Sequence, residues 1–421
     1  MSNILLCTGS TGGHFYPAYS IIQNLESNQY FLLIPINSVN ISQIYHLEQK
    51  YNVESFYIKP FHLFYLKNMI SNISVFFSDV WFICNLIDKL GIDVVIVLGS
   101  ANTIPAAFAA KIKQKKLVLM EQNVLVGKAN RFLANFADII ILPFTESLNY
   151  IHKKYHYKCY IFPNPLRKEF YTLKNKPTFK DKLENIDKDS INNDFKNDKE
   201  IKGLSLLFIG GSLGAKSINN LALKFITKIL SNELKNFNLN TITVICGKKN
   251  FGEFVYHFES TVNNIKDINY DKKINNNSAN FKFYNSNKLN NLKVEILDYV
   301  DEILDFYIDN DIIVSRAGGI ATSELIYLNK SAILIPYPYA ADDHQYYNAL
   351  VATKYNPNID FIKEEKNKEI DINVFVSKLN QNIKKIDINN RRLKINENFY
   401  FDFNKFQDLL NSLSYYKNRK Q

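Results

Sequence analysis

The sequence has few cysteines, and their spacing excludes two classes of small stabilised domain. Cys7, Cys84, Cys159 and Cys246 lie far apart, and no two of them form a C-x-x-C pair. Disulfide frameworks and structural zinc sites both depend on several closely spaced cysteines. We therefore expect reduced, buried thiols in a cytosolic protein, with neither a disulfide frame nor a zinc site.

Long apolar runs are missing as well. A helix that crosses a bilayer needs roughly 20 consecutive apolar residues. The strongest candidate, residues 61–83, is interrupted by Lys67, Asn68, Asn72 and Asp79. The first residues lack a basic segment, and their short apolar run ends in a glycine-rich turn, unlike a signal peptide. The sequence thus predicts neither a transmembrane helix nor a signal peptide.

Glycine and proline are scarce, with 14 and 11 among 421 residues, which excludes a collagen-like or low-complexity chain. The length suits two or three globular domains.

A net charge of +10 favours acidic partners, such as nucleic acid, an anionic membrane or a polyanionic substrate. No zinc finger, helix-turn-helix or RNA-binding strand motif occurs, so we expect no nucleic-acid partner.

Short apolar runs alternate with helix-length amphipathic stretches, and this alternation occurs twice. Such runs predict buried strands of a parallel sheet with crossover helices. The sequence therefore predicts an α/β fold of two Rossmann-like domains, whose facing strand ends would form a ligand cleft. The expected strands are 3–7, 30–36, 93–98, 117–120 and 138–142 in the first half, and 204–209, 241–246, 294–297, 311–315 and 332–335 in the second.

We expect two domains and a C-terminal segment. The first domain spans 1–163 and the second 164–397, and a final segment, 398–421, is expected to be a helix that packs back on the first domain. Two stretches rich in Asn and Lys, near 174–202 and 263–291, are expected to be solvated insertions in the second domain.

The first glycine-rich loop is Thr8-Gly9-Ser10-Thr11-Gly12-Gly13-His14, directly after the first expected strand. Glycines allow the backbone to approach a ligand, and the following helix N-terminus suits a phosphate. The loop is not G-x-G-x-x-G, and no acidic residue ends the second strand. A dinucleotide cofactor is therefore disfavoured.

The second glycine-rich loop, 210–214, formally matches G-x-S-x-G and leaves two interpretations open. Ser212 could be the nucleophile of a serine hydrolase, with a downstream acid and His344 as partners. It could instead be a phosphate-binding hydroxyl beside backbone N–H groups. We favour the second interpretation, because a hydrolase has one such turn, whereas this chain has matched turns in two domains and lacks an HGGG-type segment.

Two further clusters follow expected strands in the second half. Residues 315–324 form another strand, glycine turn and helix, with Glu324 expected in the first helical turn, where a carboxylate can accept ribose hydroxyls. After the Pro-rich turn 336–338, Asp342 and Gln345 suit sugar hydroxyls. Taken alone, Glu324 is equally well explained as an ordinary helix acid, and the segment after the Pro-rich turn is more often an ordinary capped helix start.

Together these segments resemble the MurG family of UDP-N-acetylglucosamine transferases, which complete lipid II in peptidoglycan synthesis. The order of the segments matches over most of the chain. They are T-G-G-H-F-Y-P at 11–17, E-Q-N at 121–123, N-P-L-R at 164–167, G-G-S-L-G-A at 210–215, Y-V-D-E-I at 299–303, S-R-A-G at 315–318, S-E-L at 323–325 and D-D-H-Q-Y-Y-N-A at 342–349. The chain departs from the family at Met120, Leu213, Ala321 and 98–102.

The resemblance implies a GT-B fold that binds UDP-GlcNAc mainly on the second domain and the lipid-linked muramoyl-pentapeptide acceptor, lipid I, on the first. It implies that the backbone of Val300 holds the uracil, Glu324 the ribose, and Ser212 with the 319–323 turn the diphosphate. The donor set that it implies is Thr11, Gly12, Gly13, Asn123, Arg167, Ser212, Val300, Gly319, Ile320, Ala321, Thr322, Ser323, Glu324 and Gln345.

The family also implies an inverting reaction without a metal ion or cofactor. The one segment that resembles a metal-binding D-x-D motif, at 187–189, lies in a polar stretch. Backbone N–H groups and helix N-termini can stabilise a departing UDP. The acceptor hydroxyl needs a general base, and His14 is the candidate, although it could equally serve only to position substrate or cap its helix.

An aromatic segment, 61–82, is flanked by Lys59, Lys67 and Lys89, which suits docking to an anionic bilayer. Core packing of two helices explains the same pattern.

We expect a peripheral enzyme on the cytoplasmic face of the bacterial inner membrane. The alternatives are a GT-B transferase with another lipid acceptor, or a degenerate, non-catalytic binding paralogue.

Overall fold

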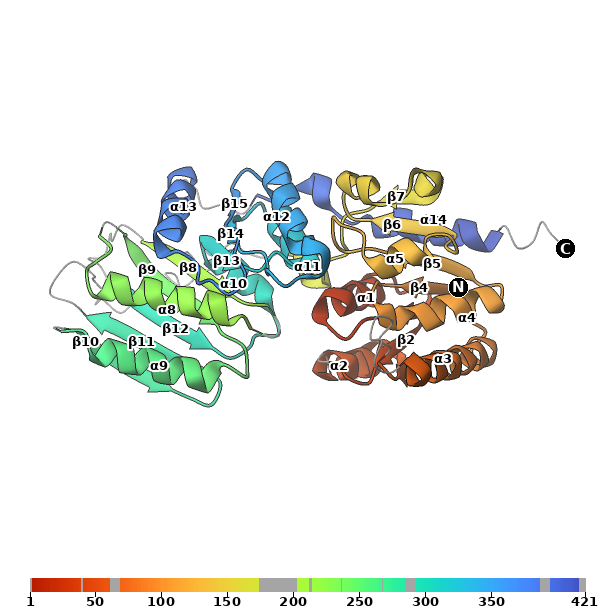
Figure 1. Cartoon of the computed structure of the whole chain (residues 1–421), viewed down its shortest axis with the longest axis horizontal. Coiled ribbons are helices and arrows are strands. Elements are labelled where there is room, and N and C mark those ends of the chain that lie inside the picture. The colour runs from red at the N-terminus through yellow and green to blue at the C-terminus, as the bar shows by residue number, and fades with distance from the viewer. Residues whose placement is uncertain are drawn as a thin grey trace, which may run out of the picture. The chain divides into compact units, whose positions relative to one another are not determined.

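The computed structural model describes residues 2–38, 41–60, 69–173, 203–211, 214–235, 237–266, 268–284, 292–386 and 394–415. The chain forms two compact units. Unit 1 comprises Met1–Tyr171 and Asn398–Gln421, and unit 2 comprises Thr172–Glu397. The division falls after Tyr171, whereas the sequence suggested 163, and each unit is a separate α/β fold (Figure 1).

Unit 1 is built on a seven-stranded sheet in which every strand pair is parallel. Its central strands are continuous apolar runs because helices cover both faces of a parallel sheet. In sheet order the strands are β3 (Glu54–Ile58), β2 (Gln29–Pro35), β1 (Asn3–Cys7), β4 (Val94–Val97), β5 (Lys116–Met120), β6 (Ile139–Leu142) and β7 (Cys159–Ile161).

The helices of unit 1 pack on this sheet through two apolar cores. The last helix of the chain belongs to one of them. The Phe162 ring lies 5.5 Å from that of Phe401 and 5.9 Å from that of Phe406. The segment from Asn398 onward thus completes unit 1. The helices are α1 (Gly12–Asn24), α2 (Ile41–Tyr51), α3 (Met69–Lys89), α4 (Ile104–Ile112), α5 (Lys128–Leu133), α6 (Lys168–Tyr171) and α14 (Phe403–Tyr415).

Unit 2 is built on an eight-stranded mixed sheet. Two antiparallel strands extend an otherwise parallel sheet, and they come from the second Asn/Lys-rich stretch. The expectation of a solvated insertion there was wrong for β11, because Ala279, Phe281 and Phe283 alternate with polar residues and enter the core, whereas β10 is mostly exposed. In sheet order the strands are β10 (Asn269–Ile274), β11 (Ser278–Tyr284), β12 (Leu292–Leu297), β9 (Leu239–Ile245), β8 (Leu204–Ile209), β13 (Ile312–Ser315), β14 (Ser331–Leu334) and β15 (Ile359–Phe361).

Three helices of unit 2, α8, α9 and α13, pack apolar faces against the sheet in one large core. Phe225 of one helix and Phe375 of another meet edge to face, with ring centroids 5.3 Å apart. The helices are α8 (Lys216–Leu230), α9 (Phe251–Asn263), α10 (Ile303–Asp309), α11 (Gly319–Tyr327), α12 (His344–Tyr355) and α13 (Ile372–Lys385). The first Asn/Lys-rich stretch, 174–202, lies outside the described residues.

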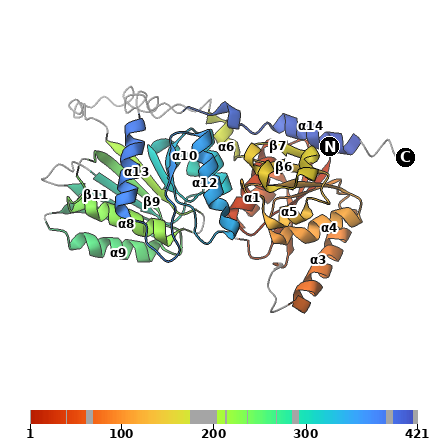
Figure 2. The ribbon, with the colours of Figure 1, turned by 45° about the horizontal axis from the view of Figure 1, so that its top comes forward.

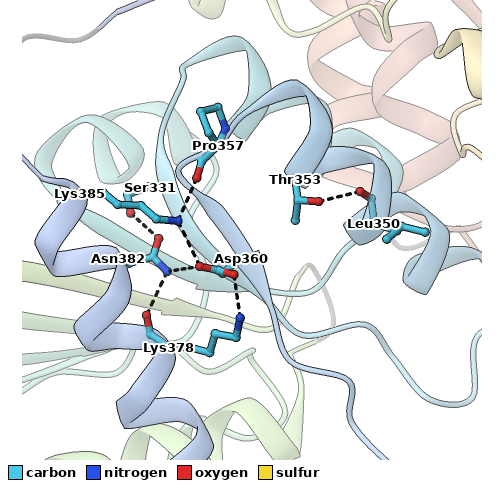
Figure 3. A network of polar contacts seen from close by, with 8 residues as sticks. All are labelled: Ser331, Leu350, Thr353, Pro357, Asp360, Lys378, Asn382 and Lys385. Atoms are coloured by element: carbon cyan, nitrogen blue, oxygen red, sulfur yellow. Dashed lines mark hydrogen bonds and ion pairs between the residues drawn. The ribbon is translucent and has the colours of Figure 1, made fainter.

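A polar network fixes α13 against the edge of the unit 2 sheet (Figure 3). Fully buried Asn382 accepts a hydrogen bond from Ser331 Oγ at 3.0 Å and donates to the Lys378 carbonyl at 3.1 Å. Asp360 on β15 pairs with Lys378 at 2.9 Å and with Lys385 at 3.3 Å. The network therefore joins α13 to β14 and β15.

The four cysteines are free, and three of them are buried. Burial raises the pKa of Cys246 to about 12 and that of Cys159 to about 11, so both thiols stay protonated near neutral pH. Over the part of the chain that the structure describes, no helix combines the length and apolarity needed to cross a membrane.

We expect Asn382→Ala to lower the free energy of unfolding by about 2 kcal/mol, because it leaves the Ser331 hydroxyl buried without its acceptor. Urea unfolding followed by circular dichroism measures the change. Lys385→Ala is the control: it removes an ion pair at the network's exposed end and should cost at most about 0.5 kcal/mol. Equal losses in both variants would contradict this role of Asn382.

Candidate active site

The first glycine-rich loop joins β1 to α1 and carries His14 in the first turn of the helix. Thr11 is the N-cap residue, and its carbonyl accepts hydrogen bonds from the backbone N–H groups of His14 and Phe15, at 3.1 and 3.2 Å. Thr11 Oγ1 also lies 3.4 Å from His14 Nδ1. The turn thus places a hydroxyl and an imidazole together at the carboxyl end of β1.

Two glycines enclose the imidazole of His14. A Cβ atom at Gly9 would lie 2.7 Å from His14 Nδ1 and 2.9 Å from Ser100 Cβ. A Cβ atom at Gly99 would lie 3.3 Å from His14 Nε2, and Gly99 has φ +77°, which favours glycine. The loops after β1 and β4 therefore need glycine at these positions to admit the ring.

The loop after β5 is organised by Glu121, which is 3% exposed. Its Oε1 accepts hydrogen bonds from the backbone N–H groups of Gln122 (3.0 Å) and Asn123 (2.9 Å) and from Asn123 Nδ2 (3.1 Å). Its Oε2 accepts from the Gly127 N–H at 2.9 Å and from Asn130 Nδ2 at 2.8 Å. The carboxylate thereby fixes the main chain and the side chain of Asn123.

Glu121 is a residue of this loop that the sequence interpretation did not single out. It was visible only as one letter of E-Q-N, and the order of residues does not say which of the three turns inward. The signal available in the sequence was the pair Gly127 and Asn130 at a fixed distance downstream, because both contact the carboxylate.

Arg167 lies in unit 1 at the end of the segment that leads from β7 to α6. It is 7% exposed, and its Nε lies 3.2 Å from Glu169 Oε1. Its guanidinium carbon lies 5.0 Å from the ring centre of Tyr16 on α1. Its neighbour Asn164 donates to the Gln122 carbonyl at 2.9 Å. This segment therefore contacts α1 and the loop after β5.

In unit 2, the loop after β8 contains Gly210, Gly211 and Gly214 in a tight turn, whereas Ser212 and Leu213 lie outside the described residues. Gly214 has φ +73°, and a Cβ atom there would lie 2.3 Å from the Cys246 carbonyl oxygen. Glycine is required at this position by the close approach of the β9 end.

The turn after β13 leads into α11, whose N-cap is Gly318. Ser323 Oγ donates to the Gly319 carbonyl at 2.9 Å, and Thr322 and Ser323 are fully buried. The expectation that Glu324 lies in the first turn was wrong: α11 begins at Gly319, so Glu324 lies in the second turn, and it is 5% exposed. The positive end of the α11 dipole is thus formed by residues 319–321.

Val300 follows β12 and is partly exposed, and Gln345 lies in the first turn of α12. Gln345 Oε1 accepts a hydrogen bond from the Tyr337 N–H at 3.0 Å, which fixes the amide against the turn after β14. The described donor candidates of unit 2 therefore lie after β12, β13 and β14 of one sheet. In unit 1, residues 11–14 and Asn123 follow β1 and β5, with only β4 between these strands.

Within the described ranges, no group of three or more His, Cys, Asp or Glu side chains is arranged to hold a metal ion. The polar groups gathered at the strand ends are hydroxyls, amides, carboxylates and one imidazole. In unit 1 such groups can bind sugar hydroxyls and receive a proton, and in unit 2 the N-terminus of α11 can bind an anion.

Two α/β units built on mainly parallel sheets, with glycine turns at their strand ends, are the architecture of the GT-B class of glycosyltransferases. Models of two domains match the chain: the glycosyltransferase family 28 N-terminal domain over residues 4–142 and the family 28 C-terminal domain over residues 205–405. The chain belongs to glycosyltransferase family 28.

Individual relatives agree with this assignment. The UDP-N-acetylglucosamine–N-acetylmuramyl-(pentapeptide) pyrophosphoryl-undecaprenol N-acetylglucosamine transferase of Fusobacterium nucleatum is 27% identical over 394 residues, 94% of each chain. The transferase of the same name from Francisella philomiragia is 28% identical over 364 residues, 84% of this chain and 82% of the relative. The crystal structure of MurG from Acinetobacter baumannii has the same fold, with a TM-score of 0.62, 17% identity and coverage of 98% and 100%.

We expect Glu121→Gln to destabilise unit 1 by about 2 kcal/mol, because the amide NH₂ group must face at least one N–H donor. Urea unfolding monitored by fluorescence or circular dichroism measures this change. Glu54→Gln, at an exposed position on the edge strand β3, is the matched control and should be neutral. A neutral Glu121→Gln would show that the carboxylate does not hold the loop.

Proposed function

We propose that the chain transfers GlcNAc from UDP-GlcNAc to the 4-hydroxyl of undecaprenyl-diphospho-muramoyl-pentapeptide, the step from lipid I to lipid II in peptidoglycan synthesis. The observation that carries the proposal is the placement of the family's donor motifs. Val300, Glu324 and Gln345 follow strands β12, β13 and β14, which belong to one sheet. The names of the two relatives, which this chain matches over most of their length, support the choice of substrates.

The proposed donor site uses the strand ends of unit 2. The backbone at Val300 contacts the uracil, and Glu324 accepts hydrogen bonds from the ribose hydroxyls. Ser212 and the turn Gly319-Ile320-Ala321-Thr322-Ser323 bind the diphosphate, where the dipole of α11 favours negative charge. Asn123, Gln345 and the Thr11-Gly12-Gly13 turn face the GlcNAc, and Arg167 contacts the nucleotide.

The proposed reaction is a single displacement. The acceptor oxygen forms a bond to C1 of GlcNAc while the bond from C1 to the UDP oxygen breaks, which inverts an α-linked donor to a β-linked product. The hydroxyl proton passes to His14, the proposed general base. The N-terminus of α11 and the glycine-turn N–H groups stabilise the charge on departing UDP, so the proposed step needs no metal ion.

The test of the function is release of UDP from UDP-GlcNAc with a muramoyl-pentapeptide lipid analogue as acceptor. We expect acceptor-dependent release that EDTA does not reduce. Release only with another lipid-linked sugar would indicate a different acceptor, and no release above background would exclude the transferase.

We expect His14→Ala to lower kcat by about 10² to 10⁴-fold, the usual contribution of a general base, with little effect on UDP affinity. Steady-state UDP release and calorimetric titration with UDP measure the two quantities. His257→Ala, at an exposed position of α9, is the control and should retain full activity. A change below threefold in kcat for His14→Ala would leave His14 as a positioning residue at most.

We also propose that unit 1 docks on an anionic membrane surface, on the cytoplasmic face of the inner membrane, through α3. Ile73, Phe77 and Trp81 are exposed at a spacing of four residues, so they form one stripe, here called the apolar stripe, beside Phe82. Trp81 is 70% exposed and Phe77 65%. In Figure 2 the N-terminal end of α3 stands out from the other helices of unit 1.

The opposite face of α3 packs into unit 1. Ile83 and Ile87 are fully buried in the core, and Phe76 meets Phe108 of α4 edge to face, with ring centroids 5.5 Å apart. Asp79 is 7% exposed, so its carboxylate is not part of the exposed stripe, and burial raises its pKa to about 6 against the opposing effect of Lys59. The core packing explains this inner face but not the stripe. Residues 61–68 of the expected docking segment lie outside the described residues.

We expect the double variant Phe77→Glu with Trp81→Glu to lose most binding to vesicles that contain phosphatidylglycerol, because each charge would enter the acyl boundary. Co-sedimentation measures binding, and turnover of a water-soluble acceptor should not change. Tyr256→Glu on α9 of unit 2 is the matched control, since Tyr256 is 71% exposed. Equal loss of vesicle binding and of turnover would show that the stripe stabilises the fold instead.

A further inference from the structure

A buried ion pair joins Arg316 and Glu364 at the carboxyl ends of the unit 2 strands. Arg316 directly follows β13, and Glu364 follows β15. Their side chains are 11% and 8% exposed. Neither residue is among the donor candidates, so the proposed chemistry leaves this pair without a role.

Arg316 binds the ends of three other chain segments. Its Nη1 donates to the Ile335 carbonyl at 3.1 Å, after β14, and to Glu364 Oε2. Its Nη2 donates to Ser217 Oγ at 2.7 Å, in the first turn of α8. Ser217 Oγ in turn donates to Glu364 Oε2 at 3.2 Å. One guanidinium therefore joins the segments that follow β8, β13, β14 and β15, which are four neighbouring strands.

The guanidinium is turned toward protein groups. Its Nη1 also lies 3.4 Å from the Pro336 carbonyl oxygen, and the ring of Tyr337 lies 5.2 Å from its central carbon. With both terminal nitrogens engaged by Glu364, a hydroxyl and two carbonyls, Arg316 is arranged to hold loops and not to bind a phosphate itself.

The segments that Arg316 joins carry the donor candidates. Tyr337, which stacks on the guanidinium, donates its N–H to Gln345 Oε1 at 3.0 Å. Arg316 is also bonded in sequence to Ala317, whose carbonyl accepts from Asn348 Nδ2 at 2.9 Å, beside the N-cap of α11. Contacts of Arg316 therefore lead both to Gln345 and to the N-terminus of α11.

A buried ion pair is poor evidence of stabilisation, because desolvation of both charges offsets most of their attraction. Apolar residues of similar volume often stabilise a fold equally well or better. What apolar residues cannot supply is the directed set of hydrogen bonds that joins four loops at once. Replacing the pair by apolar residues therefore distinguishes the two roles, because it can leave stability unchanged while it removes the hydrogen bonds that join the loops.

We propose that the Arg316–Glu364 pair, with Ser217, positions the donor loops of unit 2 and so determines affinity for the nucleoside diphosphate part of the donor. The proposal rests on the proposed function, because it takes the strand ends of unit 2 as the donor site. Arg316 and Glu364 act through the loops and are positioning residues.

The test replaces both charges at once, in the double variant Arg316→Met with Glu364→Leu. We expect a folded protein of unchanged or higher unfolding midpoint, a KM for UDP-GlcNAc raised about tenfold, and kcat changed less than threefold. The affinity for UDP, measured by calorimetry, should fall by the same tenfold factor. A stable double variant with unchanged KM and unchanged UDP affinity would overturn the proposal.

A second variant keeps the test decisive if the double variant does not fold. Glu364→Gln preserves shape and removes one charge, and it should also weaken UDP binding several-fold. The matched control is Asp360→Asn, which breaks the ion pair of β15 with α13 but touches no donor loop. It should leave KM and UDP affinity unchanged. Equal effects of Glu364→Gln and Asp360→Asn would reduce the pair to a structural role.

Amide hydrogen exchange of the ligand-free protein separates this proposal from the proposed function. Glu364→Gln should speed exchange in 317–322 and 336–345, and Asp360→Asn should not. This readout needs no substrate, so it judges the positioning role even if acceptor-dependent UDP release is absent. Unchanged exchange in both segments would contradict the positioning role whatever the transferase assay shows.

Discussion

The loops at the carboxyl ends of parallel strands leave backbone N–H and C=O groups without a regular partner, and buried charged side chains supply one. Glu121 accepts from three backbone N–H groups and two amide side chains in unit 1. Arg316 donates to main-chain carbonyls, a hydroxyl and a carboxylate in unit 2. Unpartnered buried polar groups are costly, so these two side chains determine which loop conformations are possible.

The need to supply these loop groups with hydrogen-bond partners also links the fold to the proposed chemistry. A sugar-nucleotide site needs amides, hydroxyls and helix N-termini held at fixed positions, because transition-state stabilisation depends on groups that do not reorganise during reaction. Glu121 fixes Asn123, and the chain of contacts from Arg316 through Tyr337 fixes Gln345. Two glycines, Gly9 and Gly99, define the space for the His14 ring. The charged side chains Glu121 and Arg316, together with the glycine contacts, thus fix the side chains that are proposed to bind substrate.

Much of this fold is predictable from the sequence, because the central strands are long apolar runs buried on both faces. Strand β8 has the predicted bounds, and β4 and β13 differ from them by a residue or two at their ends. The edge strands β3 and β15 were not predicted, since an exposed edge such as Glu54–Ile58 mixes polar and apolar residues and β15 is only Ile359–Phe361. The hairpin of β10 and β11 was hidden by its Asn and Lys content, and only the alternation of Ala279, Phe281 and Phe283 indicated a half-buried strand.

The sequence motifs predicted which residues belong to the candidate site, but not which charged side chains hold its loops in place. Residues 11–14, 319–324 and Gln345 all follow strand ends, whereas the contacts of Glu121 and Arg316 depend on the folded loops, as the pairing of Arg316 with Glu364 shows. Glu324 was placed one turn too early because nothing local to the sequence distinguishes Gly318 as the N-cap.

The central claim is that the strand ends of unit 2 hold a UDP-sugar between loops fixed by buried side chains. The most direct measurement is amide hydrogen exchange of the wild-type protein with and without saturating UDP. The account predicts slower exchange in 299–303, 317–324 and 336–345, and no change in the β10–β11 hairpin or in α14. Protection confined to the hairpin or to α14, with these three segments unchanged, would contradict it.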